Sequence, residues 1–193
     1  MTGEFETTPS PVRTFYPYHE AQGLTLVNKE VAQMVLDVSL EKLSEHAGVL
    51  GAIALKGVRL PGEDVVDIGK IRIGEGAHTV LFTGRDIANP AEGRRDALGE
   101  CMTWLRKGRI VRSLTAITFK DFHKGGMKRA IGVTLHELGH GFGLQHCEKA
   151  ICTMVSGKKI DRFEQPNLAF CDDCAGALEV QAIWSMHTSL AYR

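Results

Sequence analysis

The stretch that decides the fold of this chain is HELGHGFGLQHC, which runs from His136 to Cys147. On a helix, His136 and His140 lie four residues apart, so their imidazoles project from the same face, one turn apart. Both rings can therefore bind one metal ion. Gly143 can adopt a positive φ, which lets the helix end and the chain reverse. The reversal brings His146 round as a third candidate ligand.

Glu137 follows the first histidine of the motif and is placed to lie near the metal without binding it. Three neutral imidazoles leave the fourth position of a tetrahedral zinc open for water, which distinguishes a catalytic zinc site from a closed structural one. A carboxylate beside that position is suited to accept the proton of the water as a general base. The alternative is an amphipathic helix with solvated histidines, but an HExxH motif that continues to a third histidine favours the metal site.

Four of the five cysteines form a second constellation after this motif. Four residues separate Cys147 from Cys152, and two separate Cys171 from Cys174. The first residues of the chain are acidic and lack the basic and apolar regions of a secretory signal, which predicts a cytoplasmic protein. In that compartment a structural zinc held by four thiolates is favoured over two disulfides or buried thiols.

The charge of the chain argues against nucleic-acid and membrane partners. Its 193 residues include 23 Lys and Arg against 23 Asp and Glu. Without a basic excess, neither counterion release from nucleic acid nor a polybasic membrane anchor drives binding. Acidic residues outnumber basic ones, six to four, between residues 148 and 179, which disfavours a nucleic-acid-binding zinc ribbon. No run of eighteen apolar residues occurs, which excludes a transmembrane helix.

The order of strand and helix patterns predicts an α/β fold, a mixed sheet with helices in two or three layers. The expected strands are residues 49–55, 78–83, 101–105 and 110–119, and the expected helices are 28–47, 127–141 and one that starts near residue 172. Residues 61–74 fit a strand or a short helix equally well. Two segments are expected to be irregular: 1–27, which prolines interrupt, and 84–99, which is polar and rich in turn residues.

The same patterns predict the helix faces and the division of the chain. Asn28 is expected to cap the first helix, whose apolar face holds Val31, Met34, Val35 and Val38. The buried stripe of the metal-site helix is expected to hold Met127, Ile131, Leu135, Leu138 and Phe142. Residues 1–143 are expected to form an α/β subdomain that ends in this helix. Residues 144–193 would be a smaller subdomain with the four-cysteine site and a terminal helix.

Three segments together resemble the archaemetzincin (archaelysin) family of zinc metallopeptidases. They are HELGHGFGLQHC, then Cys152-Thr153-Met154, then Phe170-Cys171-Asp172-Asp173-Cys174. The resemblance implies a metzincin-like α+β fold and two zinc ions, one catalytic and one structural. It implies that the catalytic zinc is bound by His136, His140 and His146, and the structural zinc by Cys147, Cys152, Cys171 and Cys174. Glu137 would be the general base, and Met154 would be the methionine of the Met-turn, below the catalytic metal.

The function that these patterns favour is zinc-dependent hydrolysis of peptide bonds in a peptide or protein substrate, as an endopeptidase or an aminopeptidase. A strand within residues 110–119 is expected to border the cleft and to pair with an extended substrate. The alternative is a zinc-stabilised module that binds peptides or a protein with little or no turnover. Isolated histidines are expected at surface or satisfied core positions, namely His19, His46, His78, His123 and His187. Cys101 is expected to be a small buried apolar residue.

Overall fold

The main feature of the fold is a five-stranded sheet with the strand order β2-β1-β4-β8-β7. The computed structural model describes residues 15–21, 26–47, 55–60, 65–71, 78–89, 93–106, 109–120, 122, 126–156 and 168–179. The strands of this sheet are β1 (Phe15–Glu20), β2 (Lys56–Val58), β4 (His78–Thr83), β7 (Gly99–Arg106) and β8 (Arg109–Thr118). Four of them are parallel, while β7 at the edge runs antiparallel to β8.

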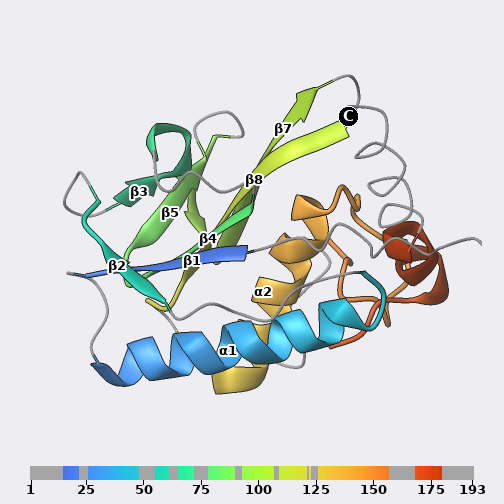
Figure 1. The fold of residues 1–193 in the computed structure, drawn as a ribbon, viewed down its shortest axis with the longest axis horizontal. Helices are drawn as coiled ribbons and strands as arrows, with labels where there is room; N and C mark the ends of the chain where they lie inside the picture. Colours follow the sequence, from blue (N-terminus) through green and yellow to red (C-terminus); the bar gives the residue numbers. More distant parts are fainter. Residues whose placement is uncertain are drawn as a thin grey trace, which may run out of the picture.

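Helices and a second, smaller sheet cover the two faces of the main sheet (Figure 1). The helices α1 (Leu26–Ser44) and α2 (Gly126–Gly141) lie on one side. The second sheet lies on the other side, with the order β3-β5-β6. Its strands are β3 (Val65–Asp67), β5 (Asp86–Asn89) and β6 (Arg94–Ala97), and the 3-10 helix η1 (Ile68–Lys70) follows β3. The predicted α/β fold with a mixed sheet is therefore confirmed.

The two faces of the main sheet can be read from alternate residues of its central strands. In β4, Val80 and Phe82 pack with the helices, whereas Leu81 packs with the second sheet. In β8, Ile117 faces the helices and Ala116 faces the second sheet. Successive side chains of a strand point to opposite faces, so the central strands β4 and β8 bury apolar residues on both faces of the sheet.

The first strand corrects the expectation that residues 1–27 are irregular. Phe15–Glu20 forms β1, which pairs in parallel with β2 on one side and β4 on the other. Pro17 lies buried within it, opposite Val80. A proline removes one backbone donor but keeps an extended φ, so it weakens a strand without ending it. Phe15 packs in the core on the helix side of the sheet, and Tyr18 packs in the core on the side of the second sheet. This packing on both faces stabilises the strand despite the proline.

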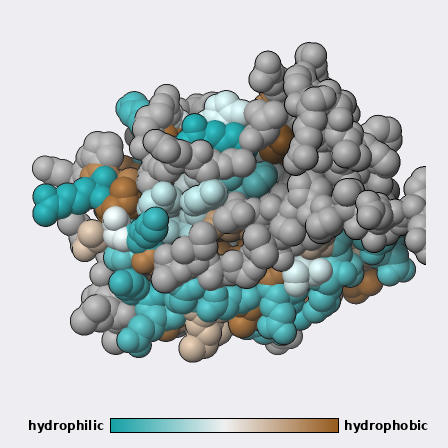
Figure 2. Space-filling view, in the orientation of Figure 1, coloured by the Kyte–Doolittle hydropathy of each residue, from teal (hydrophilic) through white to brown (hydrophobic). Residues whose placement is uncertain are grey.

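The helix α1 is confirmed, but its start and its buried face differ from the expectation. It begins at Leu26, so Asn28 lies within its first turn and does not cap it. Met34 is 53% exposed, and Val31 and Val38 are only partly buried. The fully buried side is formed by Ala32, Val35, Leu36, Leu40 and Leu43. Outward-facing residues over α1 are mainly hydrophilic (Figure 2).

Residues 84–99 are not a succession of turns, because they contribute β5, β6 and the start of β7. The polar composition of this segment does not indicate a strand, but Ile87 of β5 is completely buried in the core between the two sheets. Residues 61–74 include both expected alternatives, the strand β3 followed by η1. The expected strand at 49–55 lies outside the described residues except for Leu55, which precedes β2.

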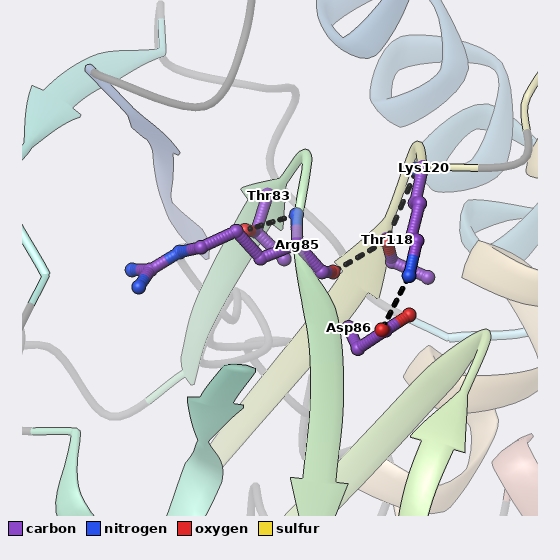
Figure 3. Close-up of polar contacts among 5 residues, drawn as sticks. All are labelled: Thr83, Arg85, Asp86, Thr118 and Lys120. Carbon is purple, nitrogen blue, oxygen red and sulfur yellow. Dashed lines mark hydrogen bonds and ion pairs between the residues drawn. The ribbon is translucent and has the colours of Figure 1, made fainter. Parts of the chain in front are cut away.

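The turn between β4 and β5 is fixed by polar contacts (Figure 3). The Thr83 hydroxyl accepts from the Arg85 amide at 3.1 Å, and the Thr118 hydroxyl donates to the Arg85 carbonyl at 2.7 Å. The Arg85 guanidinium points away from these contacts and pairs with the buried Glu20 carboxylate at 2.6 Å. Lys120 forms an ion pair with Asp86. These contacts hold the turn against the ends of β4 and β8.

The other predicted elements are confirmed. The strand 78–83 is β4, and the strands at 101–105 and 110–119 are β7 and β8. Residues 172–179 are helical and lie beside the end of α1, where the His46 and Phe170 rings meet edge to face at 6.0 Å (Figure 1). Within the described residues, no helix has the length and apolarity needed to cross a membrane.

Candidate metal centre

The helix α2 carries the first two histidines of the motif, and its packing fixes where they point. Ile131, Leu135 and Leu138 are buried in the core that α1 shares, as expected, whereas Met127 is only partly buried. The helix ends at Gly141, and Gly143 follows with a φ of 93°. Its amide donates to the His140 carbonyl at 2.9 Å. A left-handed glycine after the last turn is the reversal that the sequence predicts.

The reversal brings three histidines of the motif together. The ring centroids of His136 and His140 are 4.7 Å apart, and those of His140 and His146 are 4.8 Å apart. One ligand nitrogen from each ring lies within 4.8 Å of the others. His136 is buried and His146 is exposed, so the group opens to solvent on the side of His146. This is the arrangement of a metal site that keeps an accessible position.

Hydrogen bonds to backbone carbonyls determine the tautomers of two of these rings. Nδ1 of His136 lies 2.8 Å from the Thr153 carbonyl, and Nδ1 of His140 lies 2.7 Å from the Leu144 carbonyl. A carbonyl oxygen only accepts, so we assign the ring proton to Nδ1 in both histidines. In the neutral rings, each Nε2 then carries a lone pair, which is the state required of a metal ligand.

These two Nε2 atoms lie 3.1 Å from each other. Two lone pairs at this distance repel, so the contact requires a shared proton or a cation between the rings. Burial is the main cause that lowers the pKa of His136 from 6.5 to about 4, and the neighbouring His140 and His146 contribute to this lowering. A proton is therefore disfavoured near neutral pH. Ligand nitrogens at about 2.0–2.1 Å from a tetrahedral zinc would be about 3.3 Å apart, which is close to the observed contact.

The lowered pKa of His136 predicts how the metal-free protein responds to acid. Between pH 6.5 and 4 the unfolded chain binds a proton at this residue and the folded chain does not, so the free energy of unfolding rises with pH in this window and falls on acidification. The difference between a pKa of 6.5 and one of about 4 corresponds to about 3 kcal/mol of stability, fully present above pH 6.5. Urea unfolding of the chelator-treated protein at several pH values measures it. The variant His136→Gln should lose this slope, and an equal slope in both proteins would refute the assignment.

The four cysteines of the second constellation also converge. Their Sγ atoms all lie within 4.8 Å of one another, and none forms a disulfide. The sulfurs of Cys147 and Cys171 are 3.8 Å apart. Four thiolates at about 2.3 Å from a tetrahedral zinc would be separated by about 3.8 Å, so the set fits this ion.

Backbone amides surround the sulfur atoms and favour thiolates. The Met154 and Cys171 amides both donate to the Cys152 sulfur at 3.4 Å, and the Lys149 amide donates to the Cys147 sulfur at 3.4 Å. Burial raises the pKa of the Cys152 and Cys174 thiols. Burial acts in the same direction on the Cys171 thiol, but hydrogen bonds from the Cys174 amide and the neighbouring thiols outweigh it, so the pKa of Cys171 lies below its usual value. Donors directed at sulfur stabilise negative charge, as a closed zinc site requires.

A short loop connects the two groups. Thr153, whose carbonyl accepts the His136 hydrogen bond, lies between Cys152 and Met154. Met154 is completely buried against α2, and a Cβ at Gly139 would lie 2.4 Å from its sulfur. The role of the Thr153 carbonyl could not be found from the sequence, since every residue has a backbone carbonyl. The geometry of the histidines therefore depends on the loop that the cysteines hold.

Glu137 lies half-buried between α2 and the edge strand β7. A Cβ built on Gly99, the first residue of β7, would lie 2.6 Å from the Glu137 Cγ atom. The expectation that a strand within 110–119 pairs with an extended substrate is wrong, because β8 is already paired on both sides, by β4 and β7. The outer strand next to Glu137 is β7.

The remaining candidate residues lie apart from these groups. His78 is a core residue, and its Nδ1 lies 2.8 Å from the Ser113 hydroxyl. His19 is buried, but among the described residues no partner reaches its Nδ1. His46 is 3.9 Å from Glu179, and His123 and His187 lie outside the described residues. Cys101 is partly buried in β7, where its sulfur accepts from the Thr115 hydroxyl at 3.5 Å.

Known proteins resemble this chain in sequence and in fold. The model of peptidase family M54 matches residues 110–180. The archaemetzincin of Archaeoglobus fulgidus is 30% identical over 100 residues, which are 52% of this chain and 59% of that protein. The archaemetzincin of Saccharolobus solfataricus is 34% identical over 53 residues, 28% of this chain and 29% of that protein. The alignments thus span less than two thirds of these curated relatives.

Solved structures show the same fold. The crystal structure of archaemetzincin from Methanopyrus kandleri superposes with a TM-score of 0.64 at 17% identity, over 88% of this chain and 95% of that one. A zinc-dependent peptidase from Methanocorpusculum labreanum superposes with a TM-score of 0.56 at 16% identity, over 86% of this chain and 99% of that one. At such identities the likeness concerns the fold alone.

Proposed function

Because this chain belongs to the archaemetzincin family, peptidase family M54, we propose that it is a zinc metallopeptidase that hydrolyses peptide bonds in peptide or protein substrates. The observation that carries the proposal is the 3.1 Å contact between the Nε2 atoms of His136 and His140, whose Nδ1 atoms both face carbonyls. His136, His140 and His146 would hold the zinc. When bound there, zinc supplies Lewis acidity, which lowers the pKa of water and polarises a carbonyl group.

Glu137 would act on the proton of the attacking water. Its carboxylate accepts that proton and later delivers it to the nitrogen of the departing amine. The residue is on the same helix as His136 and His140 and follows the first of them, so it would lie near the zinc without being part of the ligand group. The half-buried side chain packs against the start of β7.

The edge strand β7 supports binding of an extended substrate by strand addition. Within the described residues it is paired only with β8, so its other side can offer backbone donors and acceptors to a peptide. The same strand begins at Gly99, next to Glu137. A peptide that pairs with β7 would therefore pass the carboxylate.

We also propose that the four cysteines hold a second, structural zinc and that residues 144–193 form a small subdomain which this ion stabilises. The protein should then contain two zinc ions per chain, measured by plasma mass spectrometry after purification with zinc. The double variant His136→Ala/His140→Ala should retain one ion. A parent with one ion, or a double variant with none, would contradict the two-site proposal.

Hydrolysis of peptides by the zinc-loaded protein is the direct test of the activity. Cleavage of members of a broad peptide library, abolished by a chelator and restored by zinc, is the expected result. A protein with both zinc ions that cleaves no member of the library would instead be a zinc-stabilised module that binds peptides. The cleavage pattern also distinguishes an endopeptidase from an aminopeptidase.

A further inference from the structure

The start of the edge strand β7 makes an unusually close contact with α2. A Cβ built on Gly99 would lie 2.6 Å from Glu137 Cγ, 3.2 Å from Glu137 Oε1 and 2.8 Å from Val133 Cγ1. Real Cβ atoms essentially never approach another heavy atom within 3.0 Å. Glu137 therefore lies in space that every other residue type at position 99 would fill.

The backbone conformation does not explain the glycine. Among the described glycines, positive φ angles occur at Gly93, Gly126 and Gly143, and Gly99 is not one of them. Any L-residue can adopt the strand conformation at this position. What glycine provides here is the absence of a side chain.

The strand and the helix are both fixed, so the contact cannot be relieved by a small shift of either. Gly99 pairs with Ile117 of β8, and the preceding Leu98 carbonyl accepts from the Thr118 amide at 2.9 Å. Gly141, two turns further along α2 than Val133, also lies close to the sheet, since a Cβ there would be 3.2 Å from the Ser113 hydroxyl. The helix thus lies close against β7 and β8 along this length.

Of the two side chains that Gly99 touches, Glu137 is the one that can move. Val133 is buried and β-branched, and such residues keep one χ1 rotamer in a helix. Glu137 is unbranched and half-buried, so its carboxylate can swing towards solvent. A side chain at position 99 would displace the Glu137 carboxylate, and its second contact, with the less mobile Val133, would strain the packing of α2 on β7.

We infer that Gly99 is a positioning residue, which holds the Glu137 carboxylate over the edge strand by leaving it room. The inference rests on the proposed peptidase function for its catalytic consequence. Its structural content, the direct contact between position 99 and Glu137, is independent of that function. Gly99 itself contributes no group to the reaction.

The thermal stability of the metal-free protein tests the contact without any activity measurement. Overpacking by Gly99→Ala should lower the Tm by roughly 5 °C. In a Glu137→Ala background the Cγ atom is gone, so the same substitution should lower the Tm by clearly less. Equal losses of Tm in the two backgrounds would overturn the inference.

Kinetics of the zinc-loaded protein test the positioning. Gly99→Ala should reduce kcat by about 10²-fold, because a misplacement near 1 Å can cost that much, while KM and zinc content stay close to those of the parent. Relief of the second clash in Gly99→Ala/Val133→Ala should recover Tm but not kcat. Recovery of kcat in that double variant, or a rise of KM alone, would assign Gly99 to helix packing instead.

Gly176→Ala is the control, because a Cβ there would meet nothing within 4 Å, and it should leave kcat unchanged and should not lower the Tm. A parent that cleaves no peptide would refute the proposed function. The Tm losses caused by Gly99→Ala in the parent and in the Glu137→Ala background would still decide whether the contact exists. A crystal structure of Gly99→Ala with an unmoved Glu137 carboxylate would also overturn the inference.

Discussion

Glu137→Ala is expected to reduce kcat for peptide hydrolysis by about 10²–10⁴-fold, the usual contribution of a positioned general base. Zinc content and Tm should stay near those of the parent. The Glu137 carboxylate takes no part in the Nδ1 hydrogen bonds of His136 and His140, so its removal from a half-buried position leaves them intact. Steady-state kinetics on a peptide that the parent cleaves, with zinc measured in the same samples, give the result.

The matched control is Glu41→Ala, which removes an exposed carboxylate on α1. It should leave kcat, zinc content and Tm unchanged. Equal turnover by the parent and by Glu137→Ala would show that Glu137 is not the base. A Glu137 variant that loses zinc together with activity would show that the carboxylate supports the metal site, which is a different role.

The parts of the site that could be predicted from the sequence are those in which spacing along the chain determines proximity in space. On a helix, the four-residue separation of His136 and His140 places the two rings together independently of the rest of the fold. Gly143 is the most favourable residue for the left-handed turn, and it does adopt a positive φ. The strand at 78–83 could be predicted because it contains the short apolar run Val80-Leu81-Phe82, which is typical of a buried parallel strand.

The parts that could not be predicted depend on contacts between distant segments. β1 contains Pro17, and only its two parallel neighbours make this segment a strand. The Thr153 carbonyl is a backbone group seventeen residues from His136, and no side chain in the sequence indicates that it contacts this histidine. Gly99 resembles an ordinary glycine in a turn-rich stretch until α2 is placed against it. In each case the decisive information is tertiary packing.

Cys171→Ser is expected to lower the Tm of the zinc-loaded protein by about 10 °C or more, because a structural zinc contributes its binding free energy directly to folding. The Cys171 sulfur is buried within 4.8 Å of the other three, and its amide donates to the Cys152 sulfur. A hydroxyl cannot replace a thiolate as a ligand of this site.

The substitution should also weaken the histidine site, although no histidine is changed. Cys152 and Cys147 each adjoin a residue on which that site depends: Thr153, whose carbonyl orients His136, and His146. Loosening the cysteine loop frees both, so the zinc affinity of the three histidines should fall in chelator competition. Cys101→Ser is the control, since this cysteine lies on β7 outside the cluster, and it should keep both ions. If Cys171→Ser melts like the parent and keeps its metals, the cysteines hold no structural ion and the two groups are independent.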